Sequence, residues 1–258
     1  MSGANDEIAR LQRRLAALRE EVGKRIVGQS DVVEQLLVCL LCDGNALIES
    51  NPGLGKTTLI RTVAEATDLT FSRIQNTPDL MPADITGTEI IREAGGSREF
   101  VFEKGPVFAN LVLADEINRA TPKTQAALLE AMQETQVTIA GETRELPRPF
   151  FVLATQNPID QEGTYPLPEA QTDRFLLKIL VGYPDRDEER EIVDRYTAGA
   201  PDPVVDRVLS RDGLRRAQQL TRQVPIADDI RDRAIDLVRA TREADDVEFG
   251  ASPRASMG

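Results

Sequence analysis

Two glycines, a lysine and a threonine in the stretch "SNPGLGKTT" (50–58) have the types and spacing that hold a phosphate. Gly53 and Gly55 allow the backbone to come close to a ligand, and successive backbone N–H groups can point toward it. Lys56 supplies a positive charge for terminal phosphates, and the Thr57 hydroxyl suits a Mg²⁺ ion. The residues expected to contact a bound nucleotide here are Asn51, Pro52, Gly53, Leu54, Gly55, Lys56, Thr57 and Thr58.

The first position of this loop differs from the usual pattern. The pattern G-x-x-x-x-G-K-[ST] has glycine where this chain has Ser50. A serine held there in a strained backbone conformation would cost about 1 kcal/mol or somewhat more. We therefore expect Ser50 to weaken phosphate binding without abolishing it.

Two carboxylates end a second apolar run, "LVLADEINRA" (111–120). If this run is a buried parallel strand, Asp115 and Glu116 lie at the carboxyl edge of the sheet, where ligands bind in open α/β folds. Asp115 can then hold Mg²⁺ through water beside Thr57, and Glu116 can polarise an attacking water. Acids can also simply mark the end of a strand, but a phosphate loop in the same chain favours the chemical role.

The composition narrows the remaining chemistry and the partners. The chain has 258 residues, 41% of them hydrophobic, no histidine and a net charge of −12. The lack of histidine excludes His-based triads and His-ligated metal sites. The negative charge disfavours nucleic acid and anionic lipid as general partners.

The cysteine and apolar patterns indicate a soluble protein. Cys39 and Cys42 form a lone C-x-x-C in a leucine-rich helical stretch, so we expect two small apolar side chains on one buried helix face. The most apolar segment, "EQLLVCLLC" (34–42), is too short to span a bilayer. We expect a cytoplasmic protein without a membrane span.

The elements that must position these residues alternate between strands and helices, which predicts a three-layer α/β fold. Short apolar runs predict strands at 45–49, 69–75, 110–116, 150–157 and 174–183. Helical periodicity predicts helices at 6–21, 31–42, 56–67 and 121–134, the second with Ser30 or Asp31 as its N-cap.

Two inserts and a helical end complete the organisation. A Gly-Gly turn within 88–108 and Gly141 within 137–146 predict two hairpins. From Pro184 onward the periodicity is helical. The expected division is an amphipathic N-terminal helix at 1–21, a nucleotide-binding core at 22–184 and a partial helical lid at 185–258.

Three long stretches carry a resemblance to a known family: "DEINRATPKTQAALLEAMQE", "FFVLATQNPIDQEGTYPLPEAQTDRFLLKI" and "GASPRAS". With the phosphate loop, they make residues from about 22 to 254 resemble the AAA+ ATPases, and specifically the MoxR family. The resemblance implies a parallel five-stranded sheet of order 5-1-4-3-2. It also implies an insert near the second helix, a hairpin before the fourth strand and a helical lid.

The resemblance also implies roles for individual residues. Asn157 in "ATQNP" corresponds to the sensor that positions the lytic water with Glu116. Arg174 in "DRF" resembles an arginine finger acting on the nucleotide of a neighbouring subunit, and Arg254 in "ASPRAS" resembles a lid sensor that touches the γ-phosphate. The segment that resembles the lining of an adenine pocket is Ile26, Val27, Gly28 and Gln29.

The implied function is Mg²⁺-dependent hydrolysis of ATP to ADP and phosphate by a hexameric ring. Such proteins act as chaperone-like motors that remodel or activate a client protein, or help to insert a metal or cofactor, often with a von Willebrand factor A domain protein. The chain ends soon after "ASPRAS", before the lid helix that this motif opens in the family. We therefore expect an incomplete lid, weak assembly and low turnover for this chain alone.

Two alternatives remain open from the residues. One is a nucleotide-binding interaction subunit with little hydrolysis, favoured by Ser50 and the short lid and opposed by Lys56, Asp115, Glu116, Asn157 and Arg174. The other is a DNA-dependent motor, which would need basic loops. The basic residues near the inserts are Arg98, Lys104, Arg144 and Arg148, interspersed with Glu93, Glu99, Glu103, Glu142 and Glu145.

Overall fold

A parallel five-stranded sheet forms the centre of the molecule, in a computed structural model that describes residues 2–257 apart from 95–96, 158–162, 198 and 200. The spatial order β2-β5-β8-β1-β9 confirms the expected order 5-1-4-3-2 when these strands are numbered along the chain. The strands are β1 (Ala46–Ser50), β2 (Phe71–Gln75), β5 (Leu111–Asp115), β8 (Phe151–Gln156) and β9 (Leu177–Val181).

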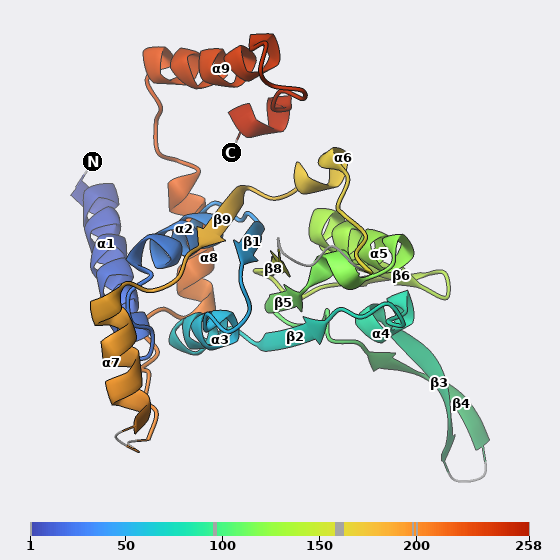
Figure 1. Ribbon diagram of the computed structural model, residues 1–258. Coiled ribbons are helices and arrows are strands. Elements are labelled where there is room, and N and C mark those ends of the chain that lie inside the picture. The colour runs from blue at the N-terminus through green and yellow to red at the C-terminus, as the bar shows by residue number, and fades with distance from the viewer. Residues whose placement is uncertain (1, 95–96, 158–162, 198, 200, 258) are drawn as a thin grey trace.

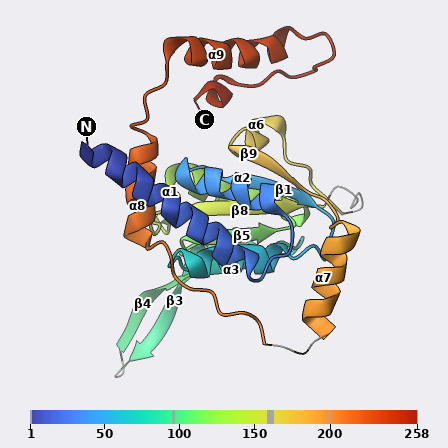
Figure 2. The same ribbon diagram turned by 90° about the vertical axis from the view of Figure 1, so that its left-hand side faces the viewer.

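Helices cover both faces of this sheet, as Figures 1 and 2 show. One face carries α1 (Ser2–Gly23), α2 (Ser30–Leu41) and α3 (Lys56–Ala66), and the other carries α4 (Pro82–Thr86) and α5 (Pro122–Glu134). Strand β5 is buried along its whole length, with Leu111 and Leu113 in the first apolar cluster and Val112 and Ala114 in the second. Two apolar faces on one strand explain its uninterrupted hydrophobic sequence.

The start of α2 differs from the prediction. Gln29, and neither Ser30 nor Asp31, is the N-cap residue, and it adopts a left-handed conformation with φ 54°. Its side-chain amide donates to the carbonyl oxygen of Leu54 at 3.2 Å. The Gln29 side chain therefore contacts the distant loop and does not cap the helix.

Each insert forms a hairpin, and the two hairpins touch. Strands β3 (Gly87–Ala94) and β4 (Ser97–Lys104) project from the body, while β6 (Gln136–Ile139) and β7 (Glu142–Glu145) are shorter (Figure 1). The guanidinium of Arg144 on β7 lies 4.1 Å from the ring centre of Phe102 on β4. The expected Gly-Gly turn at 95–96 lies outside the described residues.

The C-terminal helices divide between the core and a separate part. They are α7 (Arg186–Thr197), α8 (Arg211–Thr221), α9 (Asp228–Glu243) and the short η2 (Pro253–Ser256). Helix α8 packs on α2: Leu214 joins the core cluster, and the Gln218 amide donates to the Leu40 carbonyl at 2.9 Å. The lid predicted at 185–258 therefore includes a helix that the structure packs on the core, whereas α9 stands apart from the sheet (Figures 1 and 2). Helix η2 contacts Asp173 through Arg254.

The cysteines only partly follow the prediction. Cys39 is buried in α2, and this burial raises the pKa of its thiol to about 12. Cys42 follows the helix and is exposed, so the two do not share a buried face. In the described part of the chain, each helix is too short or too polar to cross a membrane.

Candidate active site

The phosphate loop predicted from the sequence connects β1 to α3. Gly53 and Gly55 have φ values of +83° and +72°, in the left-handed region that favours glycine. A Cβ atom added at either position would meet no described atom within 4 Å, so the loop backbone faces open space. The first turn of α3 begins at Lys56 and follows the loop directly, which directs backbone N–H groups toward that space.

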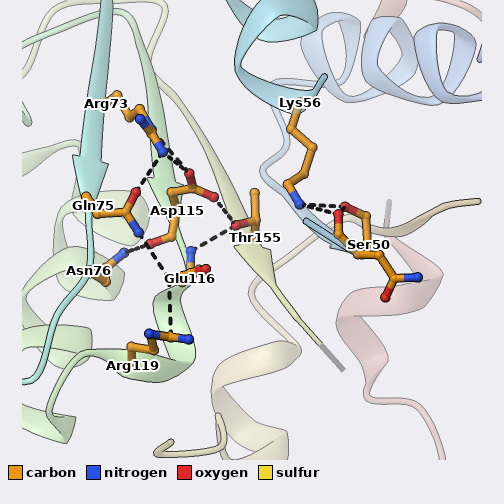
Figure 3. A network of polar contacts seen from close by, with 10 residues as sticks. Ser50, Lys56, Arg73, Gln75, Asn76, Asp115, Glu116, Arg119 and Thr155 are labelled. Carbon is orange, nitrogen blue, oxygen red and sulfur yellow. Dashed lines mark hydrogen bonds and ion pairs between the residues drawn. The ribbon is translucent and has the colours of Figure 1, made fainter. Parts of the chain in front are cut away.

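Ser50 takes part in this loop in a way that differs from the prediction. It ends β1 in extended backbone, so the expected strain does not arise, and its side chain is buried. Its hydroxyl accepts a hydrogen bond from the Lys56 ammonium at 2.6 Å and donates to the Asn51 carbonyl at 3.0 Å. The ammonium also donates to the Asn51 carbonyl at 3.0 Å (Figure 3).

Two electrostatic effects shift the pKa of Lys56 in opposite directions. Desolvation lowers its pKa, while the nearby Asp115 and Glu116 carboxylates act to raise it. The net shift is downward. The loop lysine and the two acids therefore share one electrostatic environment, as the spacing of the motifs predicts.

Asp115 is held on both of its carboxylate oxygens at the end of β5. Oδ2 accepts from Arg73 at 2.6 Å and 3.2 Å, and Oδ1 accepts from the Thr155 hydroxyl at 2.6 Å. The Asp115 carbonyl accepts from the Asn76 amide at 2.8 Å. Neighbouring strands β2 and β8 thus fix this carboxylate (Figure 3).

Glu116 follows in a left-handed conformation with φ 55° and turns its side chain along the sheet edge. Its N–H donates to the Thr155 hydroxyl at 2.9 Å. Its carboxylate accepts from the Gln75 amide at 3.1 Å and pairs with Arg119 at 3.2 Å. Two oriented acids therefore lie across the sheet edge from the loop.

Three further residues, Arg73, Gln75 and Thr155, belong to the site and were not predicted from the motifs. All three belong to strands β2 and β8 that flank β5, and each contacts Asp115 or Glu116. Polar residues in otherwise apolar strand runs, close to their carboxyl ends, were the available signal.

Thr155 offers a stability test of this arrangement. Replacing it with valine keeps the shape but removes the partner of both the Glu116 N–H and Asp115 Oδ1. We expect Thr155→Val to lower the free energy of unfolding by about 2 kcal/mol or more, measured by urea denaturation. Thr155→Ser keeps the hydroxyl and should lose clearly less. Equal stability of the valine variant and the wild type would contradict the described bonds.

A cavity of about 380 Å³ adjoins the loop. On one side it is lined by the loop residues and by Ile26, Val27 and Gln29. The C-terminal part of the chain contributes Tyr183, Ile192 and Tyr196 to its lining. Gly28 packs beside it against α7, since a Cβ there would lie 2.2 Å from Glu188 Oε1. The predicted base-binding segment and the phosphate loop therefore share one cavity.

Arg174 and Arg254, predicted as an arginine finger and a lid sensor, lie away from the phosphate loop. Arg174 donates to the Leu129 carbonyl at 3.0 Å, and Arg254 donates to the Asp173 carbonyl at 3.3 Å. Both line a separate cavity of about 1040 Å³, and among the described residues that line the 380 Å³ cavity neither is found. Arg254, predicted to be the lid sensor for the γ-phosphate, lines the larger cavity together with Arg174. Asn157 directly follows β8, next to the strand that ends in Asp115.

Comparison with known proteins identifies the family. Residues 45–177 match the family described as "ATPase family associated with various cellular activities (AAA)". The chain is 51% identical over 247 residues to "Chaperone MoxR1" of Mycobacterium tuberculosis, covering 92% of this chain and 64% of that protein. The chain belongs to the MoxR family of AAA+ ATPases.

A second sequence relative and a solved structure agree with this family assignment. The "Uncharacterized protein YeaC" of Bacillus subtilis is 43% identical over 238 residues, which cover 92% of this chain and 74% of that protein. The crystal structure of a putative ATPase from Cytophaga hutchinsonii superposes with a TM-score of 0.91 at 41% identity, covering 99% of this chain and 80% of that one. The chain spans 64% of the length of the M. tuberculosis MoxR-family relative.

Proposed function

We propose that this chain binds ATP with Mg²⁺ at the phosphate loop and hydrolyses ATP to ADP and phosphate. The observation that carries the proposal is the open glycine loop, with Lys56 in the same electrostatic environment as Asp115 and Glu116. Membership of an ATPase family supports the same activity. Phosphate release, measured with and without Mg²⁺, tests it directly.

Each residue has a proposed role. The backbone from Asn51 to Thr58 and the Lys56 ammonium bind the phosphates. Glu116 orients and polarises the attacking water, with Asn157 as its partner. Ile26, Val27 and Gln29 line the adjoining cavity and, with Gly28 next to them, hold the base beside Tyr183 and Tyr196.

The available oxygen atoms fit a magnesium ion. Thr57 stands half-buried in the first turn of α3, and Asp115 provides a carboxylate fixed by Thr155. Hydroxyl and carboxylate oxygens are the protein ligands that Mg²⁺ takes beside phosphate groups and water. When bound, Mg²⁺ would offset the negative charge of the phosphate groups.

The position of Arg174 supports a ring in which neighbours complete each other's sites. Arg174 lines a cavity away from the loop of its own chain, so we propose that it faces the nucleotide of an adjacent subunit. Arg254, on the same cavity, is the proposed lid sensor that touches the γ-phosphate. A guanidinium suits this role because its fixed charge and several donors stabilise a phosphoryl transition state. A hexamer is the proposed assembly.

Mixing experiments test the shared site. If Arg174 acts in trans, specific ATPase activity rises with protein concentration, and Arg174→Ala lowers it by about a thousandfold or more. Added Arg174→Ala protein should also inhibit the wild type beyond simple dilution, whereas the exposed control Arg186→Ala should not. Activity that is independent of concentration and unaffected by mixing would contradict the proposal.

The proposed use of hydrolysis is to remodel or activate a client protein, or to help insert a metal or cofactor, in the cytoplasm. The similarity to a relative called a chaperone supports this role. The projecting hairpin also exposes apolar side chains, with Ile91 and Phe100 paired across its strands. A von Willebrand factor A domain protein is the proposed partner.

Two other functions compare less well with the site. The backbone strain at Ser50 that would favour a binding subunit without hydrolysis does not arise, because Ser50 lies in extended backbone. A DNA motor is disfavoured because the Arg98 and Arg144 charges near the inserts are already paired with Glu93 and Glu142. Phosphate release measured with and without DNA separates all three.

A further inference from the structure

Arg73 holds the carboxylate that the proposed Mg²⁺ site needs. It lies on β2, next to β5, and two of its guanidinium nitrogens donate to Asp115 Oδ2 at 2.6 Å and 3.2 Å. The Asp115 side chain is 12% exposed, whereas the Arg73 side chain is 45% exposed. The guanidinium therefore covers a nearly buried acid from its open side (Figure 3).

Each carboxylate oxygen of Asp115 already has a hydrogen-bond partner, and Arg73 is the partner of Oδ2. Oδ1 accepts from the buried Thr155 hydroxyl at 2.6 Å, within the strand layer. Oδ2 is the remaining oxygen, and Arg73 occupies it.

We propose that Arg73 is a positioning residue that takes the place of the metal on Asp115 when the site is empty, and that it shifts away when the metal binds with nucleotide. This inference rests on the proposed function. An unpaired carboxylate in a nearly buried position is costly, so a protein cation stabilises the empty site. The same positive charge opposes a second cation on that carboxylate.

Gln75 gives Arg73 a second partner. The Gln75 side-chain oxygen accepts from Arg73 at 2.7 Å, and its amide nitrogen donates to Glu116 at 3.1 Å. Arg73 can therefore leave Asp115 and keep a hydrogen bond on the same strand. The guanidinium is also linked through Gln75 to the acid proposed to act on water.

The consequence is that Arg73 lowers the affinity of the site for a divalent ion. The test uses Mn²⁺ as the probe, titrated into the full chain with saturating ADP and followed by electron paramagnetic resonance. We expect Arg73→Gln to bind Mn²⁺ about fivefold more tightly than the wild type, a size suited to one partly exposed ion pair. A role that is only structural would leave Mn²⁺ affinity unchanged or lower it.

Matched variants make the result interpretable. Arg98→Gln removes a similar exposed ion pair with Glu93 on the projecting hairpin and should leave Mn²⁺ affinity unchanged. Arg73→Lys keeps the charge but loses the two-nitrogen contact, so we expect a gain of about twofold, and it replaces Arg73→Gln if that variant does not fold. Unchanged or weaker Mn²⁺ binding in the folded Arg73 variant overturns the inference. Failure of the wild type to bind ADP would instead overturn the proposed function.

Discussion

Glu116→Gln is expected to reduce the ATP turnover number by about a hundredfold to ten-thousandfold, the range found when a general base is lost. Glutamine has the same shape as glutamate and can keep a hydrogen bond to the Gln75 side chain. It carries no negative charge to polarise water. Nucleotide affinity should therefore stay within about twofold of the wild type, because the phosphate loop is unchanged.

Phosphate release and nucleotide binding must both be measured on this variant. Glu145→Gln, on the exposed strand β7, is the matched control and should have wild-type turnover. A variant that binds ATP normally but still hydrolyses it at the wild-type rate would remove Glu116 from the chemistry. A wild type that binds but releases no phosphate would favour the interaction-subunit alternative.

Lys56→Ala is expected to weaken ATP binding by about tenfold to a hundredfold, because hydrogen bonds from a charged group contribute about 1.5–3 kcal/mol. The loop donates hydrogen bonds to phosphate from the Lys56 ammonium and from backbone N–H groups. The variant loses the ammonium but keeps the N–H groups. The variant should fold, since Lys56 contacts only Ser50 and Asn51 among the hydrogen bonds described here. Fluorescence of a labelled ATP analogue measures the loss.

Lys123→Ala, an exposed residue at the start of α5, is the control for charge alone and should bind like the wild type. If Lys56→Ala binds the nucleotide as tightly as the wild type, the ammonium does not reach the phosphates. The contact with Ser50 would then be its permanent position.

Local pattern predicted most of the architecture. The apolar runs placed all five strands of the sheet within a few residues, because strands covered on both faces must be apolar throughout. Glycine spacing likewise located the loop, since Gly53 and Gly55 adopt backbone angles that other residues avoid.

Contacts between distant segments account for what the sequence did not predict. The periodicity of α8 shows an apolar face but cannot say that α2 covers it. The Gln29 bond to Leu54 and the Arg254 bond to Asp173 join residues far apart in the chain. Arg73 was missed for the same reason, because a single arginine in a strand reveals its partner only when the strand order is known.

Isothermal titration calorimetry of the folded wild-type chain with ATP and Mg²⁺ tests the central claim most directly. The claim is that the loop between β1 and α3 binds a nucleoside triphosphate. We predict saturable uptake of one ATP per chain that weakens in Lys56→Ala. Absence of measurable binding by protein shown to be folded by circular dichroism would contradict the account and leave only the architecture.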